Sequence, residues 1–428
     1  MPNRLGIADT VRCAGLVLAP MLAQGVIRRR DRVVRLAERL DLDRRGARVL
    51  GELRDRHGDG PLRLAVPGRS VAVVLSADGV RRVLTGTPEP FSPATTEKVA
   101  ALRHFQPHGV LISTGAVREE RRRFNEAVLD TGAELHHAVA GPLAEIVHDE
   151  VKRLDPGRLL VYRTFEAMFN RIVRRIVLGA AARDDTGVTA ELNRLRAAAN
   201  WAYLRPRDEQ LRGRFQRRIE AYVARAEPGS LAGALAVALA GAPAGTPATA
   251  GLDPAGQIPH WLFAYDAAGI TAFRTLALLG SDPDRQATAT RDEAPVLPFL
   301  RACVHDTVRL WPTTLVVLRE STVDTDWPDG TLPAGTSFVL PSSYFHRSDN
   351  DAFTPESWLS GAAQDSWSTF PFSAGPGVCP GRNLVLLTTS TLIAALLDRF
   401  APLRTVHPLR APLPRTLDHS KLRIELRA

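Results

Sequence analysis

The feature that most constrains this chain is a glycine-rich loop that carries one cysteine, from Phe372 to Gly381. It reads Phe-Ser-Ala-Gly-Pro-Gly-Val-Cys-Pro-Gly and comes directly before an apolar helical run, predicted over Leu384–Leu397. Gly375, Gly377 and Gly381 allow backbone amides to approach one atom in conformations that a Cβ would forbid. Pro380 suits the first helical position, because its missing N–H needs no partner there. A cysteine among such amides, at a helix N-terminus, has its thiolate form favoured.

The pattern Phe-x-x-Gly-x-x-x-Cys-x-Gly resembles the haem-ligand loop of the cytochrome P-450 (haem-thiolate monooxygenase) family. The resemblance extends over essentially the whole chain. It implies a single, mainly α domain over residues 1–428 with small β-sheets, a long central helix over one haem b, and the cysteine loop beneath. Cys379 is then the iron ligand, and its thiolate assists cleavage of the O–O bond. The alternative is a buried structural cysteine, a common fate of this residue type.

Composition describes an ordinary globular protein with an excess of basic charge. Of 428 residues, 45% are hydrophobic and 24% charged, and the formal net charge is +9. The basic residues are nearly all arginine, with only three lysines, and the runs Arg28–Arg30 and Arg121–Arg123 lack interleaved aromatic residues. We therefore exclude a nucleic-acid partner. A basic patch that docks an acidic electron donor is the better interpretation, because complementary potentials speed encounter.

The cysteines and the N-terminal apolar run bear on location. Cys13, Cys303 and Cys379 are odd in number and widely spaced, which predicts neither a disulfide framework nor a zinc site and favours the reducing cytoplasm. The run from Ala14 to Ile27 is too short to span a bilayer, and its basic residues follow it rather than precede it, unlike a secretory signal. We expect no membrane span here but a strap on the protein surface. Weak membrane contact is the alternative.

Helical patterns dominate, and strand signals gather toward the two ends of the chain. Two β-branched runs separated by Pro67-Gly68 predict a hairpin within residues 62–86. Further short strands are expected near 314–341 and 422–426, and helices over 116–226, 231–239, 258–279 and 296–310. A flexible connection is expected after the helix at 231–239. The apolar helix over 258–279 contains Asp266 and Arg274, which favours a core helix over a bilayer span.

Asp306 and Arg309 lie three residues apart in a predicted helix and can therefore pair on one face. The sequence Asp-Thr-Val-Arg-Leu-Trp-Pro resembles the family's Glu-x-x-Arg helix, which implies a buried pair behind the haem, here with aspartate for glutamate. The segment at 353–358 resembles the one that supplies a further arginine, but this chain has Ser357 there. We expect Arg347, His346 or water to complete the pair. The alternative is an ordinary surface ion pair.

The resemblance also implies basic partners for the two haem propionates. The family often places one basic residue two positions before the cysteine, where this chain has Gly377. Arg319 matches a second family position. A third lies on the predicted helix near 116–130, where the spacing allows Arg121 or Arg122. For each arginine the alternative is a solvated surface side chain.

The segment Phe263–Gly269 of the predicted core helix matters most for mechanism. It is similar to the family's oxygen-side motif, in which small residues precede an acid and a threonine. In the preferred register Asp266 is the acid and Ala267 replaces the threonine; a shifted register gives Thr271 and Ala272 these positions. Without the hydroxyl, protons are expected from the substrate, from ordered water or from Asp266. The alternative is that Asp266 only pairs with an arginine of a neighbouring helix.

Taken together, the resemblance implies that O2 is activated to oxidise an apolar organic substrate of the secondary-metabolite kind. The pocket is expected to be lined by the helix around Phe263–Thr271, the loop near Ser92–Leu111 and the strand after Pro312. No segment resembles a reductase, so a ferredoxin or flavodoxin is the expected electron donor. A peroxide-driven or oxidative-coupling haem-thiolate enzyme and a non-catalytic haem-binding protein are the alternatives. The departures at Asp306, Gly377 and Ala267 keep both open.

Overall fold

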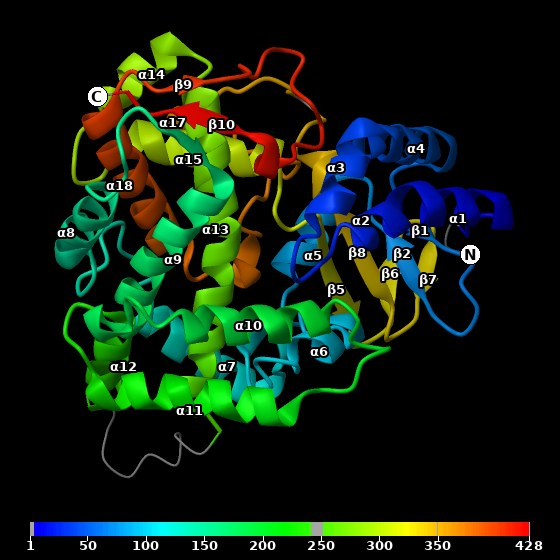
Figure 1. Ribbon diagram of the computed structural model, residues 1–428. Helices are drawn as coiled ribbons and strands as arrows, with labels where there is room; N and C mark the ends of the chain where they lie inside the picture. Colours follow the sequence, from blue (N-terminus) through cyan, green and yellow to red (C-terminus); the bar gives the residue numbers. More distant parts are fainter. Residues whose placement is uncertain (1–3, 241–250, 349, 428) are drawn as a thin grey trace. The chain divides into compact units, whose positions relative to one another are not determined.

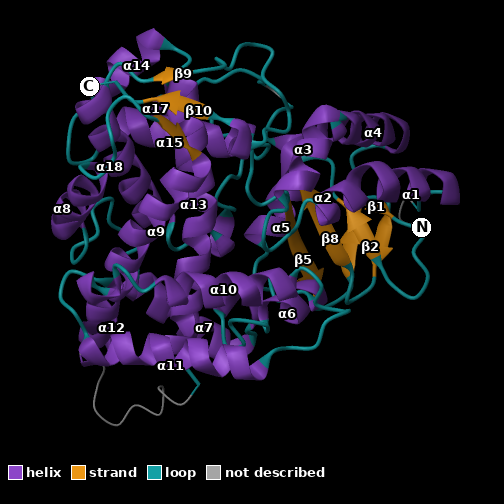
Figure 2. Cartoon of the chain, viewed as in Figure 1, coloured by secondary structure: helices purple, strands orange, loops and turns teal. Residues whose placement is uncertain are grey.

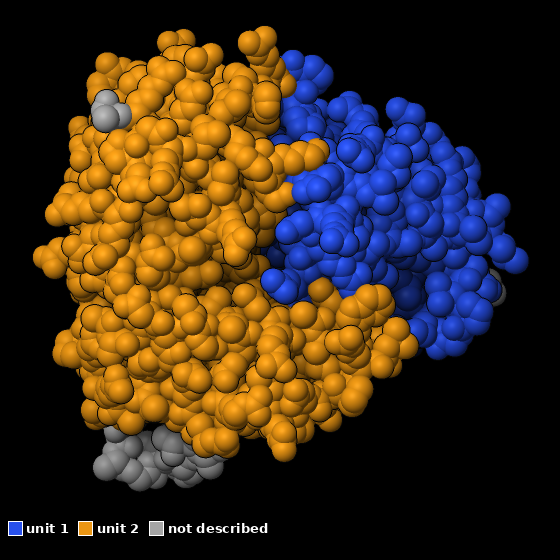
Figure 3. Space-filling model, in the orientation of Figure 1, with its two compact units in different colours: residues 1–98, 305–379, 411–418 blue, residues 99–304, 380–410, 419–428 orange. Residues whose placement is uncertain are grey.

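The computed structural model describes residues 4–240, 251–348 and 350–427. Most of these residues lie in α-helices and the strands form small sheets, as predicted (Figures 1 and 2). The chain divides into two compact units, shown in Figure 3. Unit 1 comprises residues 1–98, 305–379 and 411–418, and unit 2 comprises residues 99–304, 380–410 and 419–428. A single domain over residues 1–428 stays a prediction.

Unit 1 contains a five-stranded sheet with the strand order β1-β2-β8-β5-β3. Its strands are β1 (Leu62–Arg63), β2 (Val71–Val73), β3 (Phe91–Ser92), β5 (Val316–Ser321) and β8 (Ser337–Pro341). β1 and β2 form the predicted hairpin, with Leu62 opposite Val73. β2 runs parallel to β8, whereas β8 with β5 and β5 with β3 are antiparallel. A separate hairpin joins β6 (Thr325–Trp327) to β7 (Gly330–Leu332). Strand β5 carries Arg319.

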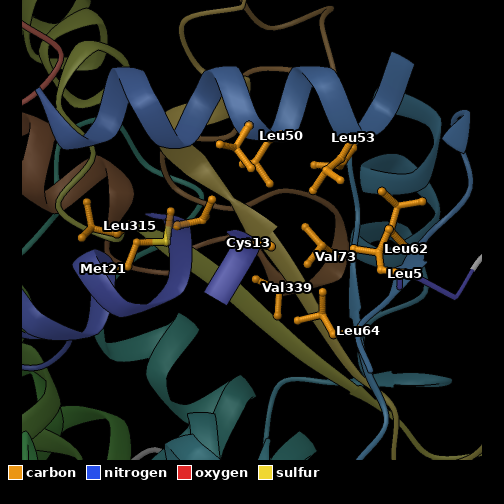
Figure 4. Packing of buried hydrophobic residues seen from close by; sticks show 13 residues of the cluster. Leu5, Cys13, Met21, Leu50, Leu53, Leu62, Leu64, Val73, Leu315 and Val339 are labelled. Atoms are coloured by element: carbon orange, nitrogen blue, oxygen red, sulfur yellow. The ribbon is translucent and has the colours of Figure 1, made fainter. Parts of the chain in front are cut away.

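Unit 1 also contains helices from the N-terminal part of the chain, several of which pack on this sheet. They are α1 (Ile7–Cys13), a π-helical turn (Ala14–Leu18), α2 (Ala19–Ala23), α3 (Asp31–Arg39), α4 (Leu42–His57) and α5 (Ala77–Thr85); α16 (Ser342–Phe345) and α17 (Glu356–Leu359) come later. Cys13, Val17 and Met21 recur at helical spacing and are buried in one cluster with Val73 and Val339 of the sheet (Figure 4). The predicted strap is therefore helical, with one face in the core.

Unit 2 is mainly helical and has a three-stranded sheet in the order β4-β10-β9. The strands are β4 (Leu159–Val161), β9 (Arg404–Thr405) and β10 (Arg423–Glu425); the helices are α7 (Gly115–Val128), α8 (Ala140–Val151), α9 (Tyr162–Leu178), α10 (Thr186–Ala199), α11 (Glu209–Arg225), α12 (Leu231–Ala240), α13 (Ile258–Leu279), α14 (Pro283–Thr290) and α18 (Arg382–Phe400). Two further helices, α6 (Thr96–Leu102) and α15 (Pro298–Leu310), contribute residues to both units. The predicted flexible connection after α12 falls on residues 241–250, outside the described residues.

Helix α13 has the bounds that the sequence predicted and is mostly buried. Among the described residues, the helical stretches Ala255–Leu279 and Arg382–Phe400 are long and apolar enough to cross a membrane, but 78% and 61% of these windows are buried inside the protein. Burial in the core accounts for their apolar character. Gly269 marks a close approach of α13 to α9, because a Cβ there would lie 2.8 Å from Cδ1 of Phe169.

We expect Gly269→Ala to destabilise unit 2. The added methyl group must displace the buried ring of Phe169, and overpacking of this kind costs about 1–3 kcal/mol. The measurement is the free energy of unfolding from denaturant titration. Gly213→Ala in α11 is the matched control, because its Cβ would meet only the flexible end of Arg217 at 3.5 Å, and alanine favours a helix by about 0.5–1 kcal/mol. Equal stabilisation by both substitutions contradicts the packing argument.

Candidate functional site

The cysteine loop belongs to unit 1 and folds back on itself. The Cys379 amide donates to the Phe372 carbonyl at 2.9 Å, and the Val378 amide donates to the Gly375 carbonyl at 3.0 Å. Gly375 has a φ of +61°, and a Cβ there would lie 2.5 Å from the carbonyl oxygen of Leu84 at the end of α5. Only glycine fits such a position. Packing against α5 therefore fixes the shape of the loop, with Cys379 half-buried at its end.

Two predictions about this loop are wrong in their detail. Gly377 and Gly381 have no positive φ. A Cβ on Gly377 would lie 2.9 Å from Nη2 of Arg319, so this glycine makes room for a guanidinium, whereas the nearest neighbour of a Cβ on Gly381 would be 4.0 Å away. Pro380 is not the first helical residue either. α18 begins at Arg382, because its first turn closes when the Val385 amide donates to the Gly381 carbonyl.

Arg319 brings a buried positive charge to the cysteine loop. Its guanidinium donates to three uncharged acceptors: the Thr87 hydroxyl at 3.0 Å, the Leu318 carbonyl at 2.9 Å and the Ser373 hydroxyl of the loop at 3.2 Å. Burial, and then the charge of Arg319, hold the pKa of Lys98 well below its usual value. Nζ of Lys98 donates to the Leu318 carbonyl at 2.8 Å. A buried cationic site of this kind suits a carboxylate such as a haem propionate.

The arginines of α7 have different hydrogen-bond partners, a difference that the sequence did not reveal. Arg121 donates to the Gly251 carbonyl at 2.6 and 2.9 Å and to the Ser113 hydroxyl at 2.7 Å, so its donors serve the protein itself. Arg122 pairs with Glu126 at 2.5 Å. Arg118 is buried, and its Nε has no hydrogen-bond partner among the described residues. Burial, and then the neighbouring charge of Arg122, lower the pKa of Arg118.

Arg118 is therefore a candidate propionate partner that the sequence reasoning missed. A buried guanidinium nitrogen without an acceptor costs about 1–3 kcal/mol, and a carboxylate would remove that cost. Arg118 lies four residues before Arg122, so both side chains share a face of α7. This spacing was the available signal, but the Arg121–Arg123 run drew attention away from it. Lys98 carried no signal in the sequence.

The pair of Asp306 and Arg309 is buried and bidentate. Arg309 Nε lies 2.6 Å from Oδ1 of Asp306, and Arg309 Nη2 lies 3.1 Å from Oδ2. The shorter aspartate thus reaches both nitrogens. Its carboxylate also accepts from the Thr354 amide at 2.7 Å and from the Trp358 indole N–H at 3.0 Å. Trp358, next to Ser357, supplies a donor where the family has a third arginine.

Of the predicted partners for this pair, His346 takes part and Arg347 does not. Arg309 donates to the backbone carbonyls of His346, Asn350 and Ala352. Burial, and then the charge of Arg309, lower the pKa of His346 to about 3, so its imidazole is neutral. Arg347 pairs instead with Asp351 and donates to the carbonyls of Leu413 and Pro414. The prediction for Arg347 is wrong because an acid four residues away captures its guanidinium.

In unit 2, Asp266 of α13 pairs with an arginine of α10. Arg196 Nη2 lies 2.5 Å from Oδ2 of Asp266, and the Arg196 side chain is almost fully buried. The guanidinium also lies 5.0 Å from the centre of the Phe263 ring. A cavity of about 30 Å³ adjoins the pair, lined by polar side chains that include Asn170, Asn193, Asp266 and Arg196. Such a cavity is large and polar enough to hold a water molecule.

The next turn of α13 bears on the two registers of the oxygen-side motif. The Thr271 hydroxyl donates to the Ala267 carbonyl at 2.9 Å, so this hydroxyl bonds within its own helix. The packing of Phe169 already explains why residue 269 is glycine. Both observations favour the register with Asp266 as the acid and Ala267 at the hydroxyl position.

Comparison with known proteins agrees with this geometry. The sequence profile described as Cytochrome P450 matches residues 283–415, which contain both the Asp306–Arg309 pair and the cysteine loop. Residues 283–415 belong to the cytochrome P450 family. Among solved structures, a six-coordinated cytochrome P450 from Thermus thermophilus has a TM-score of 0.65 at 21% identity and covers 89% of this chain and 98% of that one. Another cytochrome P450 crystal structure gives 0.67 at 18% identity, covering 89% of this chain and 94% of that one. The chain therefore has the cytochrome P450 fold.

Curated relatives match only part of this chain. A probable cytochrome P450 4d20 of Drosophila melanogaster is 32% identical over 122 residues, which cover 27% of this chain and 24% of that protein. A cyclooctat-9-en-7-ol 5-monooxygenase of Streptomyces melanosporofaciens is 28% identical over 118 residues, or 26% of each chain. The alignments thus span about a quarter of the length of these relatives.

We expect Trp358→Phe to destabilise this protein. Phenylalanine keeps a ring beside His305 but leaves the buried Asp306 carboxylate without one donor, which costs about 1.5–3 kcal/mol for a bond to a charged group. The free energy of unfolding measures the effect. Trp327→Phe is the control, because that indole donates at 3.1 Å to the neutral Thr325 hydroxyl and its loss costs about 0.5–1.5 kcal/mol. A Trp358→Phe variant no less stable than the control refutes the assigned role.

Proposed function

We propose that this chain is a haem-thiolate oxidoreductase of the monooxygenase type that activates O2. The observation that carries the proposal is the loop whose backbone Gly375 fixes against α5, so that Cys379 stands directly before α18. When bound, haem iron with a thiolate ligand supplies the activation of dioxygen. The protein supplies a positioned ligand, buried cations for the propionates, and a route for protons.

The proposed haem contacts follow from the donor chemistry of each unit. Cys379 is the proposed iron ligand. Arg319 in unit 1 and Arg118 in unit 2 are the proposed partners of the carboxylates, since these buried cations favour an anion. Arg122 is a weaker candidate, because it already pairs with Glu126. Haem b fits because it carries two carboxylates. Arg121 is the weakest of the arginine candidates, because its donors already bond to Gly251 and Ser113.

Proton delivery is proposed to run through Asp266 rather than through a hydroxyl at position 267. Asp266 borders a polar cavity that can hold water, and its partner Arg196 is itself buried. The ion pair with Arg196 orients the carboxylate that would relay protons from water in the cavity. Thr271 contributes no hydroxyl to this route, because it donates within α13 to the Ala267 carbonyl.

The proposed substrate is an apolar organic molecule, in keeping with a relative named for a cyclooctat-9-en-7-ol. The proposed electron donor is a separate ferredoxin or flavodoxin, which the net charge of +9 would attract if the donor is acidic. We propose a cytoplasmic protein without a membrane span, since its two long apolar helical stretches are mostly buried. A single cytochrome P450 domain over residues 1–428 is part of the proposal.

A second candidate, a peroxide-driven haem-thiolate enzyme, is favoured by one observation. Position 267 has no hydroxyl, and the Thr271 hydroxyl one turn later bonds within the helix. Hydrogen peroxide already contains the protons and electrons that O2 would have to receive. An enzyme that uses hydrogen peroxide would therefore not need that hydroxyl.

Replacing Cys379 by alanine is expected to abolish thiolate ligation, because alanine offers iron no ligand. The measurement is the absorption spectrum of haem-loaded, reduced protein under carbon monoxide, in which thiolate ligation gives a distinctive red-shifted band. Cys13→Ala, which removes a buried sulfur from the same unit, keeps that band. A Cys379→Ala protein that retains it, or a parent protein that takes up no haem, overturns the proposed function.

Asp266→Asn is expected to lower oxygen consumption by about 10²-fold or more, because an amide cannot relay a proton. The assay uses a surrogate ferredoxin, its reductase and reduced nicotinamide. Peroxide-driven turnover changes far less. Ala267→Thr is expected to lower the fraction of oxygen released as hydrogen peroxide, because it restores a hydroxyl beside the acid. Asp284→Asn, at an exposed position in the first turn of α14, serves as the control. Unchanged oxygen consumption in Asp266→Asn contradicts the proton route.

A further inference from the structure

The helical segment from Ile7 to Ala23 has one face in the core of unit 1 and an apolar face in solvent. Cys13, Val17 and Met21 point inward, as Figure 4 shows for Cys13 and Met21. On the outer face Ile7 is 79% exposed, Val11 65% and Leu22 61%. A solvent-facing helix normally carries polar side chains there. This outer ridge, Ile7, Val11 and Leu22, therefore needs another explanation.

The sequence of this helical segment contains a long uncharged stretch, and the first charged residues after that stretch are arginines. The sequence from Cys13 to Ile27 has no charged residue, and Leu16 and Val26 within it are also exposed. The acids near the start of the ridge are neutralised, since Asp9 contacts Arg56 and His57, and Glu52 pairs with Arg12. No net negative charge therefore borders the ridge at that end.

The segment as a whole is strongly basic. Between Arg4 and Arg48 there are eleven arginines and no lysine against five acidic residues. This tenth of the chain thus carries most of the formal net charge of +9. Helix α3, which follows the ridge, exposes Leu36 and Leu40 beside the exposed Arg32 and Arg39. Apolar side chains flanked by arginine are the pattern of a helix that lies in a lipid–water interface.

We propose that the outer ridge and the arginines around it dock this protein peripherally on an anionic lipid surface. The apolar side chains would enter the boundary between headgroups and acyl chains, and the arginines would face lipid phosphates. A second copy of this chain is a poorer occupant, because two such surfaces repel each other through their like charges. The proposal needs no membrane span and does not depend on the proposed redox chemistry.

The test is flotation of the full chain with lipid vesicles. We expect binding to phosphatidylcholine vesicles that contain about 30% phosphatidylglycerol, little binding to phosphatidylcholine alone, and release at about 0.5 M salt, where charges are screened. The variant Ile7→Ser/Val11→Ser/Leu22→Ser is expected to lower the partition coefficient by about tenfold or more. These side chains are exposed, so the fold should survive, and circular dichroism melting checks that it does.

Two matched controls test whether vesicle binding depends on the ridge itself, or only on the number of exposed apolar side chains and the net charge. Val237→Ser/Val323→Ser/Leu359→Ser removes three side chains of 74%, 54% and 52% exposure from other surfaces and should bind vesicles like the parent. Arg32→Glu/Arg39→Glu should lose the preference for anionic lipid, whereas Arg214→Glu/Arg217→Glu in α11, with the same change in net charge, should keep it. The proposal is overturned if the parent chain fails to float with anionic vesicles. It is also overturned if ridge and control variants bind alike, or if sedimentation shows a dimer that only the ridge variant dissociates.

Discussion

The fully buried carboxylate of Asp306 is the constraint on which the organisation of unit 1 depends. A buried carboxylate must be matched by donors, and this one accepts from the guanidinium of Arg309, the Thr354 amide and the Trp358 indole. Arg309 in turn holds three backbone carbonyls between 346 and 352. One ion pair thereby orders residues 346–348 and 350–352, which lie in turns and loop. Removing either partner would leave a buried charge unmatched, at a cost of about 3–5 kcal/mol.

The same helix that carries this pair also steadies the cysteine loop. His305, next to Asp306, stacks on Trp358 at 4.6 Å and meets the edge of Phe372 at 5.3 Å between ring centres. Phe372 then accepts the hydrogen bond of the Cys379 amide. From β5, Arg319 donates to Ser373 of the loop. Ion pair, aromatic stack and loop thus form one connected set of contacts within unit 1, which helps to position the backbone that carries Cys379.

Helix α13 combines burial with a charged side chain, two features that usually exclude each other. It is buried over most of its length, yet it carries Asp266, and the arginine that meets this acid comes from another helix, α10. A polar cavity beside the pair is large enough for a water molecule next to an otherwise apolar helix. The alternative that Asp266 pairs with an arginine of a neighbouring helix is therefore confirmed as geometry. This pairing is compatible with the proposed proton delivery, because it orients a carboxylate that borders a cavity able to hold water.

Local patterns in the sequence determined a large part of this protein. Glycine spacing around Cys379, the apolar stretch of α13 and the Asp306–Arg309 spacing each predicted an element or pair that the structure contains, because these signals act over a few residues. Only the tertiary structure decided which arginine of α7 has a buried Nε with no acceptor among the described residues. It also decided that an indole donates to Asp306 and that Gly377 leaves space for Arg319. It also decided that one face of the N-terminal helices stays in solvent. These features depend on contacts between side chains that lie far apart in the sequence. A short stretch of sequence therefore cannot show which groups are buried or which hydrogen-bond partners they have.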